Sequence, residues 1–136
     1  MKIEENGVTA TIFTDLRKTG PFVQYEEEDI NVALKNTLYS VVVYDTFNQP
    51  VGMGRIIGDN RIAFFIKDVV VVPEMQGKGI GTLIMRSLFD YISKHACKNA
   101  YIGLMSTPGK EGFYEKFGFI RRPNDQYGAG MVLYWK

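Results

Sequence analysis

The segment from Val69 to Thr82 constrains the fold of this chain more than any other part of it. Four consecutive valines lead into a proline, three glycines follow at every second position (Gly77, Gly79 and Gly81), and an apolar helical pattern begins among them. A valine-rich run is typical of a buried strand. Glycines without β-carbons let a ligand approach the main chain, and free N–H groups at a helix start favour a phosphate. The segment therefore predicts a strand–loop–helix unit that binds phosphate, and a tight turn without a ligand is the alternative that the glycines alone leave open.

The rest of the chain shows a mixed pattern of strands and helices. Alternating or valine-rich stretches predict strands at residues 8–14, 39–45, 51–57, 61–72 and 99–105, and two closing strand segments from Phe119 to the end. Apolar residues at helical spacing predict helices over 28–38, from Ile80 onward and over 108–117. The order predicts an α/β (α+β) fold in which an antiparallel meander precedes two parallel strands joined by a right-handed crossover.

Length and composition limit the classes of protein. The chain has 136 residues, 46% hydrophobic and 23% charged, which predicts one globular domain over residues 1–136. No apolar run reaches the roughly 18 residues of a membrane span, and the N-terminus lacks a signal pattern, so we expect a cytoplasmic protein without a membrane partner. The net charge of +1 gives no support for nucleic-acid binding, and one cysteine with one histidine predicts no metal site. A homodimer is one expected assembly.

The spacing of the loop residues excludes two common nucleotide motifs. The phosphate loop G-x-x-x-x-G-K-[ST] is absent, because no glycine stands five residues before Gly77. The dinucleotide motif G-x-G-x-x-G starts at Gly77 and Gly79 but finds Thr82 where its third glycine belongs. A module for ordinary nucleotides is therefore disfavoured.

Two other motifs carry a resemblance to a known family. The first combines V-x-V-x-P with Q-x-x-G-x-G, formed by Val69, Val71, Pro73, Gln76, Gly79 and Gly81. It resembles the coenzyme-A-binding motif of the GCN5-related N-acetyltransferase (GNAT) superfamily. The segment Gly112–Phe119 resembles the second signature of that superfamily, a short helix with a tyrosine followed by lysine, glycine and phenylalanine. The order of elements from Tyr39 to the end is also similar to that of the family.

The resemblance implies an N-acetyltransferase that moves an acetyl group from acetyl-coenzyme A, as co-substrate, directly to a primary amine. It implies a mixed central sheet of six to seven strands, splayed beside the loop to admit coenzyme A. The pantetheine arm is expected at the strand edge Val70–Val72 and the pyrophosphate on the loop amides, while Ser106 or Thr107 replaces an asparagine that many members use. The cofactor-binding residues so implied are Val70, Val71, Val72, Gln76, Gly77, Lys78, Gly79, Ile80, Gly81, Thr82, Ser106, Thr107 and Tyr114.

The acid and base candidates follow from the same resemblance. Tyr114 matches the family tyrosine that protonates the coenzyme A thiolate, and a phenol with a pKa near 10 is protonated at neutral pH. Asp68 lies where several members carry the base, although a strand carboxylate can equally pair with Lys67 or Arg55. A backbone amide at Val70 or Val71 is the expected oxyanion donor. His95 and Cys97 are expected to have structural roles.

The acceptor site is expected in the least regular stretches, residues 15–28 and 123–131. The substrate-binding candidates are Phe22, Tyr25, Glu26 and Tyr127. Acidic residues at 26–29 can attract a cationic amine, or simply complement the following helix start. A small-molecule amine and a protein amine both remain open as acceptors. A non-catalytic acyl-coenzyme A sensor or partner-binding module on the same fold is the alternative to an enzyme.

Overall fold

The computed structural model describes residues 1–136 as two units, Met1–Gly103 and Leu104–Lys136. The first unit is built on one five-stranded sheet in the order β1-β2-β3-β4-β5. Its strands are β1 (Lys2–Glu5), β2 (Tyr39–Tyr44), β3 (Pro50–Gly58), β4 (Ala63–Val71) and β5 (Tyr101–Gly103). The first four strands pair antiparallel, and β5 pairs parallel with β4 after the crossover through α3.

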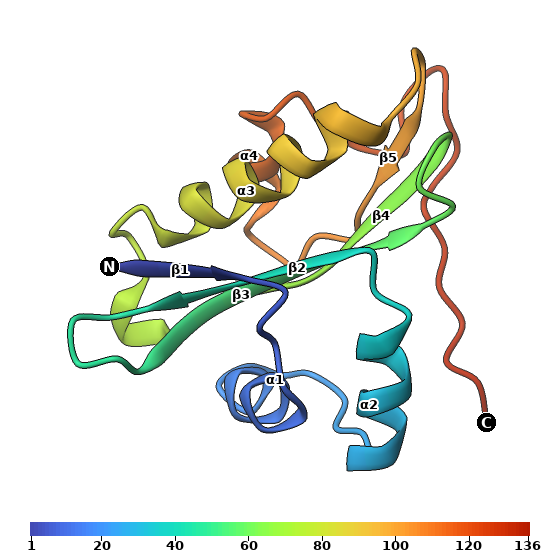
Figure 1. The fold of residues 1–136 in the computed structure, drawn as a ribbon. Helices are drawn as coiled ribbons and strands as arrows, with labels where there is room; N and C mark the ends of the chain where they lie inside the picture. Colours follow the sequence, from blue (N-terminus) through green and yellow to red (C-terminus); the bar gives the residue numbers. More distant parts are fainter. The chain divides into compact units, whose positions relative to one another are not determined.

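Three helices cover the two faces of this sheet. Figure 1 shows α1 (Ala10–Arg17) and α2 (Glu27–Lys35) on one face and the long helix α3 (Ile80–His95) on the other. Helix α3 buries one apolar stripe, which consists of Ile80, Ile84, Met85, Leu88 and Ile92. The valines of β2 are fully buried between the two helical layers. Burial of apolar side chains on both faces of the sheet therefore supplies the core of the first unit.

Two glycines of β3 allow α3 to approach the sheet closely. A Cβ atom added at Gly54 would lie 2.7 Å from Ile84 Cγ2 and 3.2 Å from Leu88 Cδ1. At Gly52 the same atom would lie 3.0 Å from Ile80 Cγ2 and from Ile84 Cδ1. The missing side chains are thus replaced by the apolar stripe of α3, which fixes how α3 and the loop before it sit on the sheet.

Strand β4 contains an irregularity at Asp68. Between the pairs Met53–Val70 and Arg55–Lys67, the two residues Asp68 and Val69 face the single residue Gly54. Asp68 has φ of 57°, in the left-handed region that is uncommon for residues other than glycine, asparagine and aspartate. This geometry is a β-bulge, which bends the strand and turns the Asp68 side chain toward α1.

The parallel pairing of β4 with β5 is short. It covers only Ala63–Phe65 of β4, opposite Tyr101–Gly103. Beyond Phe65, β4 continues to Val71 with β3 on one side and no strand of the sheet on the other. The expected splay therefore lies within the first unit, between Ile66 and Val71.

The second unit contains one short helix, α4 (Glu111–Glu115). The ring of Phe113 lies 5.1 Å from that of Tyr114 and 5.2 Å from that of Phe117, both edge to face. From Leu104 onward the chain contains no strand. Its last apolar residues, Met131–Trp135, are exposed in the described structure.

The expected mixed α+β architecture, the meander and the parallel β4–α3–β5 unit are confirmed, with three corrections. The predicted strand at residues 8–14 is wrong, because Ala10–Arg17 forms α1 instead. The sheet has five strands and not six to seven, since residues 119–136 pair with no strand. Strand β1 was not predicted. None of the helices combines the length and apolar character that a membrane span requires.

Candidate active site

The glycine loop before α3 leaves its main chain open. Gly77 and Gly79 have φ of 78° and 84°, and a Cβ atom added at either would meet no other atom within 4 Å. The first backbone bond of α3 runs from Leu83 N–H to Gly79 C=O. The amides of Ile80 to Thr82, in the first turn, therefore have no partner within the helix. These amides and the positive end of the helix dipole suit a phosphate group.

Strand β4 offers a free edge beside this loop. The amide of Val72 donates to Val51 C=O in β3 at 2.9 Å, and successive residues of a strand point their N–H groups to opposite edges. The amide of Val71 therefore faces the edge that β5 leaves open. The Val71 carbonyl accepts a bond of 3.0 Å from the Gln76 side chain. Gln76 thus ties the end of β4 to the loop, and the Val71 amide stays available to an extended ligand.

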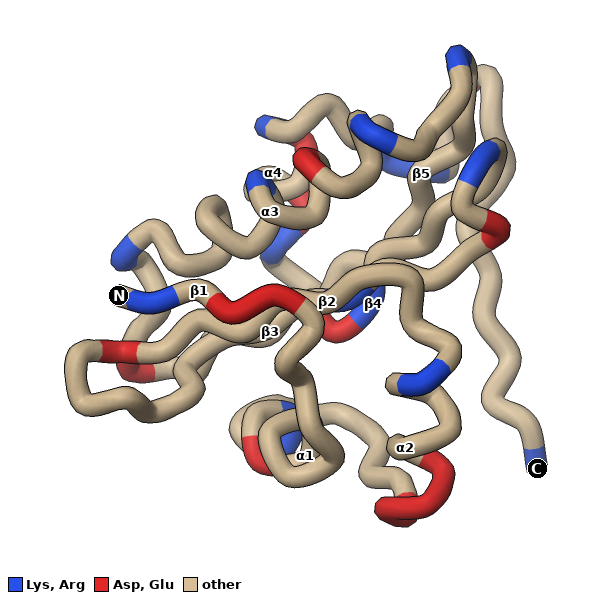
Figure 2. Tube along the Cα trace, in the orientation of Figure 1, with Lys and Arg blue, Asp and Glu red and all other residues tan.

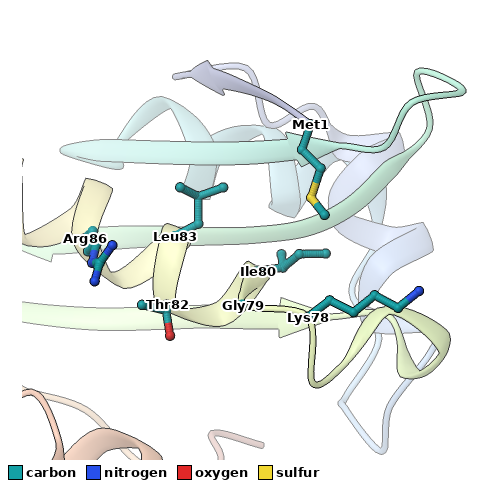
Figure 3. Close-up of a pocket in the computed structure, with 7 residues that line it drawn as sticks. All are labelled: Met1, Lys78, Gly79, Ile80, Thr82, Leu83 and Arg86. Atoms are coloured by element: carbon teal, nitrogen blue, oxygen red, sulfur yellow. The ribbon is translucent and has the colours of Figure 1, made fainter.

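A cavity of about 340 Å³ lies at the start of α3 (Figure 3). Its wall consists of Met1, Lys78, Gly79, Ile80, Thr82, Leu83 and Arg86. Figure 3 shows Lys78 and Arg86 at opposite ends of this group of side chains. Their two positive charges add to the dipole of α3, so the first turn of α3 is favourable for an anion from both sources.

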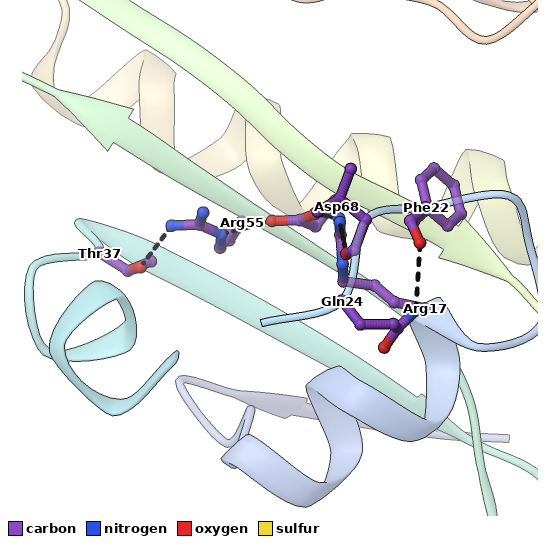
Figure 4. A network of polar contacts seen from close by, with 7 residues as sticks. Arg17, Phe22, Gln24, Thr37, Arg55 and Asp68 are labelled. Carbon is purple, nitrogen blue, oxygen red and sulfur yellow. Dashed lines mark hydrogen bonds and ion pairs between the residues drawn. The ribbon is translucent and has the colours of Figure 1, made fainter. Parts of the chain in front are cut away.

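A buried ion cluster surrounds the bulge of β4 (Figure 4). Arg17 Nη1 donates to Asp68 Oδ1, and Arg55 Nε donates to Asp68 Oδ2 at 2.6 Å. The exposed fractions of these side chains are 8% for Arg17, 11% for Arg55 and 3% for Asp68. Arg55 Nη1 also donates to Thr37 Oγ1 at 3.1 Å, and Arg17 Nη2 to Val23 C=O at 2.7 Å. Pairing with Arg55, one of the alternatives to a base role that the sequence left open for Asp68, is thus present in the structure, and each carboxylate oxygen accepts a guanidinium N–H.

A second cavity, of about 240 Å³, lies over this cluster on the α1–α2 face of the sheet. Its wall is formed by Phe13 and Arg17 of α1, by Tyr25 just before α2, by Asp29, Ile30 and Ala33 within α2, and by Arg55, Lys67 and Asp68 of the sheet. Apolar surface and charged groups therefore meet in one small space, which is typical of a ligand site.

The acceptor candidates of the first unit lie close to this cavity, but in different roles. The rings of Phe22 and Tyr25 lie 5.0 and 5.5 Å from the guanidinium carbon of Arg17, at cation–π distance. Only Tyr25 lines the cavity. Glu26 is the N-terminal cap residue of α2, and Figure 2 shows acidic residues gathered at this helix start. The acidic first turn of α2, formed by Glu27, Glu28 and Asp29, complements the helix dipole.

The remaining candidates belong to the second unit. Burial raises the pKa of the Tyr114 phenol above its ordinary value, so the hydroxyl stays protonated at neutral pH. The Ser106 hydroxyl donates to Thr107 C=O at 2.8 Å. The guanidinium of Arg122 lies over the ring of Tyr127 at 5.3 Å.

His95 and Cys97 both lie at the end of α3. The His95 ring stacks on Tyr91 at 4.1 Å, and its Nδ1 lies 2.9 Å from the Tyr91 carbonyl oxygen. Cys97 is a free cysteine whose amide donates to Arg61 C=O at 3.0 Å. No group of three or more His, Cys, Asp and Glu side chains is placed to hold a metal ion.

Arg17 is the main residue that sequence reasoning missed. It is buried on α1, 51 residues from its partner Asp68, and the stretch around it was interpreted as a strand and a loop. The available signal was helical spacing, since Phe13, Leu16 and Arg17 share the buried face of α1. With α1 recognised, an arginine on an apolar face would have indicated a buried partner.

Comparisons with known proteins agree with the fold. A family model described as the acetyltransferase (GNAT) domain matches residues 6–134. GCN5-related N-acetyltransferase 1, chloroplastic, of Arabidopsis thaliana is 34% identical over 112 residues, which are 82% of this chain and 56% of that protein. Serotonin N-acetyltransferase 2, chloroplastic, of Oryza sativa subsp. japonica is 31% identical over 119 residues, 83% of this chain and 56% of that protein. The chain thus spans little more than half the length of these relatives.

A solved structure extends the likeness to the whole chain. A protein of Staphylococcus aureus, described as a probable acetyltransferase, is 29% identical, with a TM-score of 0.87 and 98% of each chain covered. The family model, the two plant relatives and this structure agree with one another. The chain belongs to the GNAT family of acetyltransferases.

Proposed function

We propose that this chain is an N-acetyltransferase that transfers an acetyl group from acetyl-coenzyme A directly to a primary amine. Family membership supports acetyl transfer, and the geometry of the first unit supports this donor. One observation carries the proposal most directly: the free edge of β4 at Val71 and the open amides of Ile80–Thr82 stand at the two ends of one short loop. An extended ligand with an anionic end fits these two sets of donors.

The residues fit acetyl-coenzyme A part by part. The pantetheine arm carries amide groups, which match the free N–H of Val71 as an added strand would. The pyrophosphate matches the first turn of α3, where Gly77 and Gly79 leave open space and Lys78 adds a charge. Ser106 and Thr107 are the proposed further contacts of the pantetheine arm. When bound, acetyl-coenzyme A supplies the activated acetyl thioester.

The proposed chemistry needs few side chains. The attacking amine must be neutral, and the oxyanion that forms on the acetyl carbon requires a hydrogen-bond donor, which we assign to the Val71 amide. Tyr114 is the proposed acid for the departing thiolate, and its raised pKa keeps the proton in place at neutral pH. Each oxygen of Asp68 already accepts a hydrogen bond from Arg17 or Arg55, so the carboxylate is held in the ion cluster. We therefore assign to Asp68 the role of holding the bulge of β4, and we propose that water accepts the proton of the amine.

The proposed acceptor site is the cavity over the ion cluster. It is lined by Asp68 of the bulge, two residues before Val70 in β4, and by Tyr25. Its volume of about 240 Å³ is below the roughly 300 to 1,000 Å³ of drug-sized ligand sites, so it suits a small amine or one side chain of a protein. The Oryza relative is named for serotonin, and amines of that class belong in any test. The cytoplasmic location stays a prediction, because both plant relatives are named chloroplastic.

An amine panel tests the proposal. The protein is incubated with acetyl-coenzyme A and a set of small amines and lysine peptides, and release of the free thiol is followed together with the mass of the acetylated amine. Amine-dependent thiol release is the expected result. If acetyl-coenzyme A stabilises the protein by thermal shift but no amine is acetylated, the proposal fails and an acyl-coenzyme A sensor takes its place.

A further inference from the structure

The ion cluster under the acceptor cavity carries an unbalanced positive charge. Two guanidinium groups, of Arg17 and Arg55, share the single carboxylate of Asp68. All three side chains are at least 89% buried, since their exposed fractions are 8%, 11% and 3%. A buried charge without a counter-charge is unfavourable, because the interior solvates it poorly.

No second carboxylate of the first unit compensates this charge. The structure contains two other ion pairs, Lys94–Asp90 and Arg121–Glu115, and neither involves the cluster. Asp29 lines the same cavity but forms no ion pair with either arginine. In addition, Arg17 Nε is a buried donor without a hydrogen-bond partner. The cluster therefore has one carboxylate in ion pairs with two guanidinium groups, and aromatic rings such as Phe13 supply only partial compensation.

Two cationic side chains of the cavity wall, Arg55 and Lys67, are placed to bind an anion. Arg55 uses Nε for Asp68 and Nη1 for Thr37, which leaves Nη2 without a bond in this cluster. Lys67 pairs with Arg55 across β3 and β4, so both side chains project from the same face of the sheet, and Lys67 is exposed on the wall. The apolar walls, including Ile30 and Ala33, can cover the uncharged part of a ligand.

We propose that the acceptor is a small primary amine that also carries an anionic group, a carboxylate or a phosphate, which binds between Arg55 and Lys67. The anion completes the charge balance of the cluster, while the amine of the same molecule is left to reach the thioester. Arg17 also lines the cavity, but its assigned role is to hold Asp68 in position, and the anion itself is assigned to Arg55 and Lys67. This inference rests on the proposed function and narrows its substrate class.

Matched acceptor pairs test it by steady-state kinetics with the full chain and acetyl-coenzyme A. Tyramine is compared with tyrosine, serotonin with 5-hydroxytryptophan, and ethanolamine with phosphoethanolamine. Each pair differs by the anionic group, and the third distinguishes phosphate from carboxylate. The anionic member is expected to have at least about a tenfold higher kcat/KM, mainly through KM, as a charge-assisted hydrogen bond provides. Added salt should reduce this preference.

Variants of Lys67 and Arg55 test whether these two side chains cause the preference for anionic acceptors. Lys67→Met should lower the preference for the anionic member, mainly by raising the KM of that member, and Lys67→Arg should restore the preference. Lys35→Met, an equally exposed change on α2 outside the cavity, is the matched control and should alter neither. Arg55→Lys, which keeps the charge but loses the forked geometry, should also lower the preference.

The inference is overturned if neutral and anionic members are used equally well, or if the preference survives both Lys67→Met and Arg55→Lys. Failure of the proposed function looks different, since no amine would then release the thiol. In that case, calorimetric titration of tyrosine and of tyramine into the protein with bound acetyl-coenzyme A still tests the cavity. Tighter binding of tyrosine supports the inference, and equal or absent binding of the two contradicts it.

Discussion

Replacement of Asp68 by alanine should destabilise the protein far more than a surface change. The variant leaves the guanidinium groups of Arg17 and Arg55 buried without their carboxylate, and breaking a buried ion pair in this way costs about 3 to 5 kcal/mol. Alanine must also hold φ near 57°, which adds about 1 to 2 kcal/mol for a residue with a β-carbon. The sum is about 4 kcal/mol or more, a large part of the 5 to 15 kcal/mol that stabilises a typical domain.

A set of variants at the same position separates the two contributions. Asp68→Gly loses the charge but accepts the left-handed conformation, so it should be about 1 to 2 kcal/mol more stable than Asp68→Ala. Asp68→Asn tolerates the conformation and keeps one acceptor oxygen, so it should lose less than either. Urea unfolding followed by circular dichroism gives the free energy of unfolding of each variant.

Asp90→Ala is the matched control for these variants. Asp90 pairs with Lys94 on the surface of α3, where the two side chains are 64% and 67% exposed. Such a pair contributes about 0.5 kcal/mol or less. If Asp68→Ala costs no more than this control, the cluster does not stabilise the bulge. If the glycine and alanine variants are equally stable, the left-handed backbone carries no strain.

Three further predictions concern chemistry, packing and pH. Tyr114→Phe should reduce turnover by about a hundredfold to ten-thousandfold with little change in the KM for acetyl-coenzyme A, because a general acid acts in the transition state. A loss of turnover below about fivefold, with chemistry rate-limiting, would indicate that water and not Tyr114 is the proton donor. Gly54→Ala should lower the free energy of unfolding by about 1 to 3 kcal/mol, because its Cβ would lie 2.7 Å from Ile84 Cγ2. Gly112→Ala is the control and should cause no loss of stability, because a Cβ there would meet open space. Equal unfolding midpoints of the two variants would refute the close packing of α3. Asp59 accepts three backbone N–H bonds in the β3–β4 turn, which lower its pKa, so its stabilising effect is present above pH about 4 and is lost as the pH falls through that lowered value. Asp59→Asn should therefore show a smaller drop in melting temperature between pH 7 and pH 3 than the parent protein, and an equal drop would show that this carboxylate is not involved.

The segments with strong local signals were predictable from the sequence. The valine run, the glycine loop and the periodic helix after it predicted β4, the open loop and α3 within a few residues. In these segments, local preference and tertiary packing favour the same structure. The free edge of β4 was expected only from the family resemblance, and the structure shows it because β5 is shorter than the strand predicted over residues 99–105.

The errors arise where long-range contacts decide the structure. Residues 8–14 alternate and are rich in β-branched residues, yet Thr9 caps a helix by accepting the Ile12 amide at 3.2 Å, and packing of Phe13 on the sheet stabilises it. The short charged strand β1 shows no pattern of its own, and it is defined by its pairing with β2. Residues 119–136 end in the apolar run Met131–Trp135 without a neighbouring strand, and an apolar run alone does not provide the partner that a strand requires.

The candidate site divides in the same way. The loop residues share one segment, so the open glycines and the helix start after them were predictable from local signals, while the ligand assigned to them follows from the family resemblance. Arg17 meets Asp68 only through the tertiary fold, and no spacing rule relates residues so far apart in the chain. The cavity over the ion cluster therefore became visible only in the structure.

Amide hydrogen exchange resolved by residue, with and without acetyl-coenzyme A, tests the central claim most directly. The account predicts that the ligand slows exchange at Val71 and at Ile80–Thr82, whose N–H groups have no partner in the sheet or the helix. The amide of Val72 is the internal control, because it is already bonded to Val51 and its slow exchange should change much less. Slowed exchange at Val71 and in the first turn of α3 would support a backbone-held acetyl-coenzyme A. Binding without any change at these amides would contradict it.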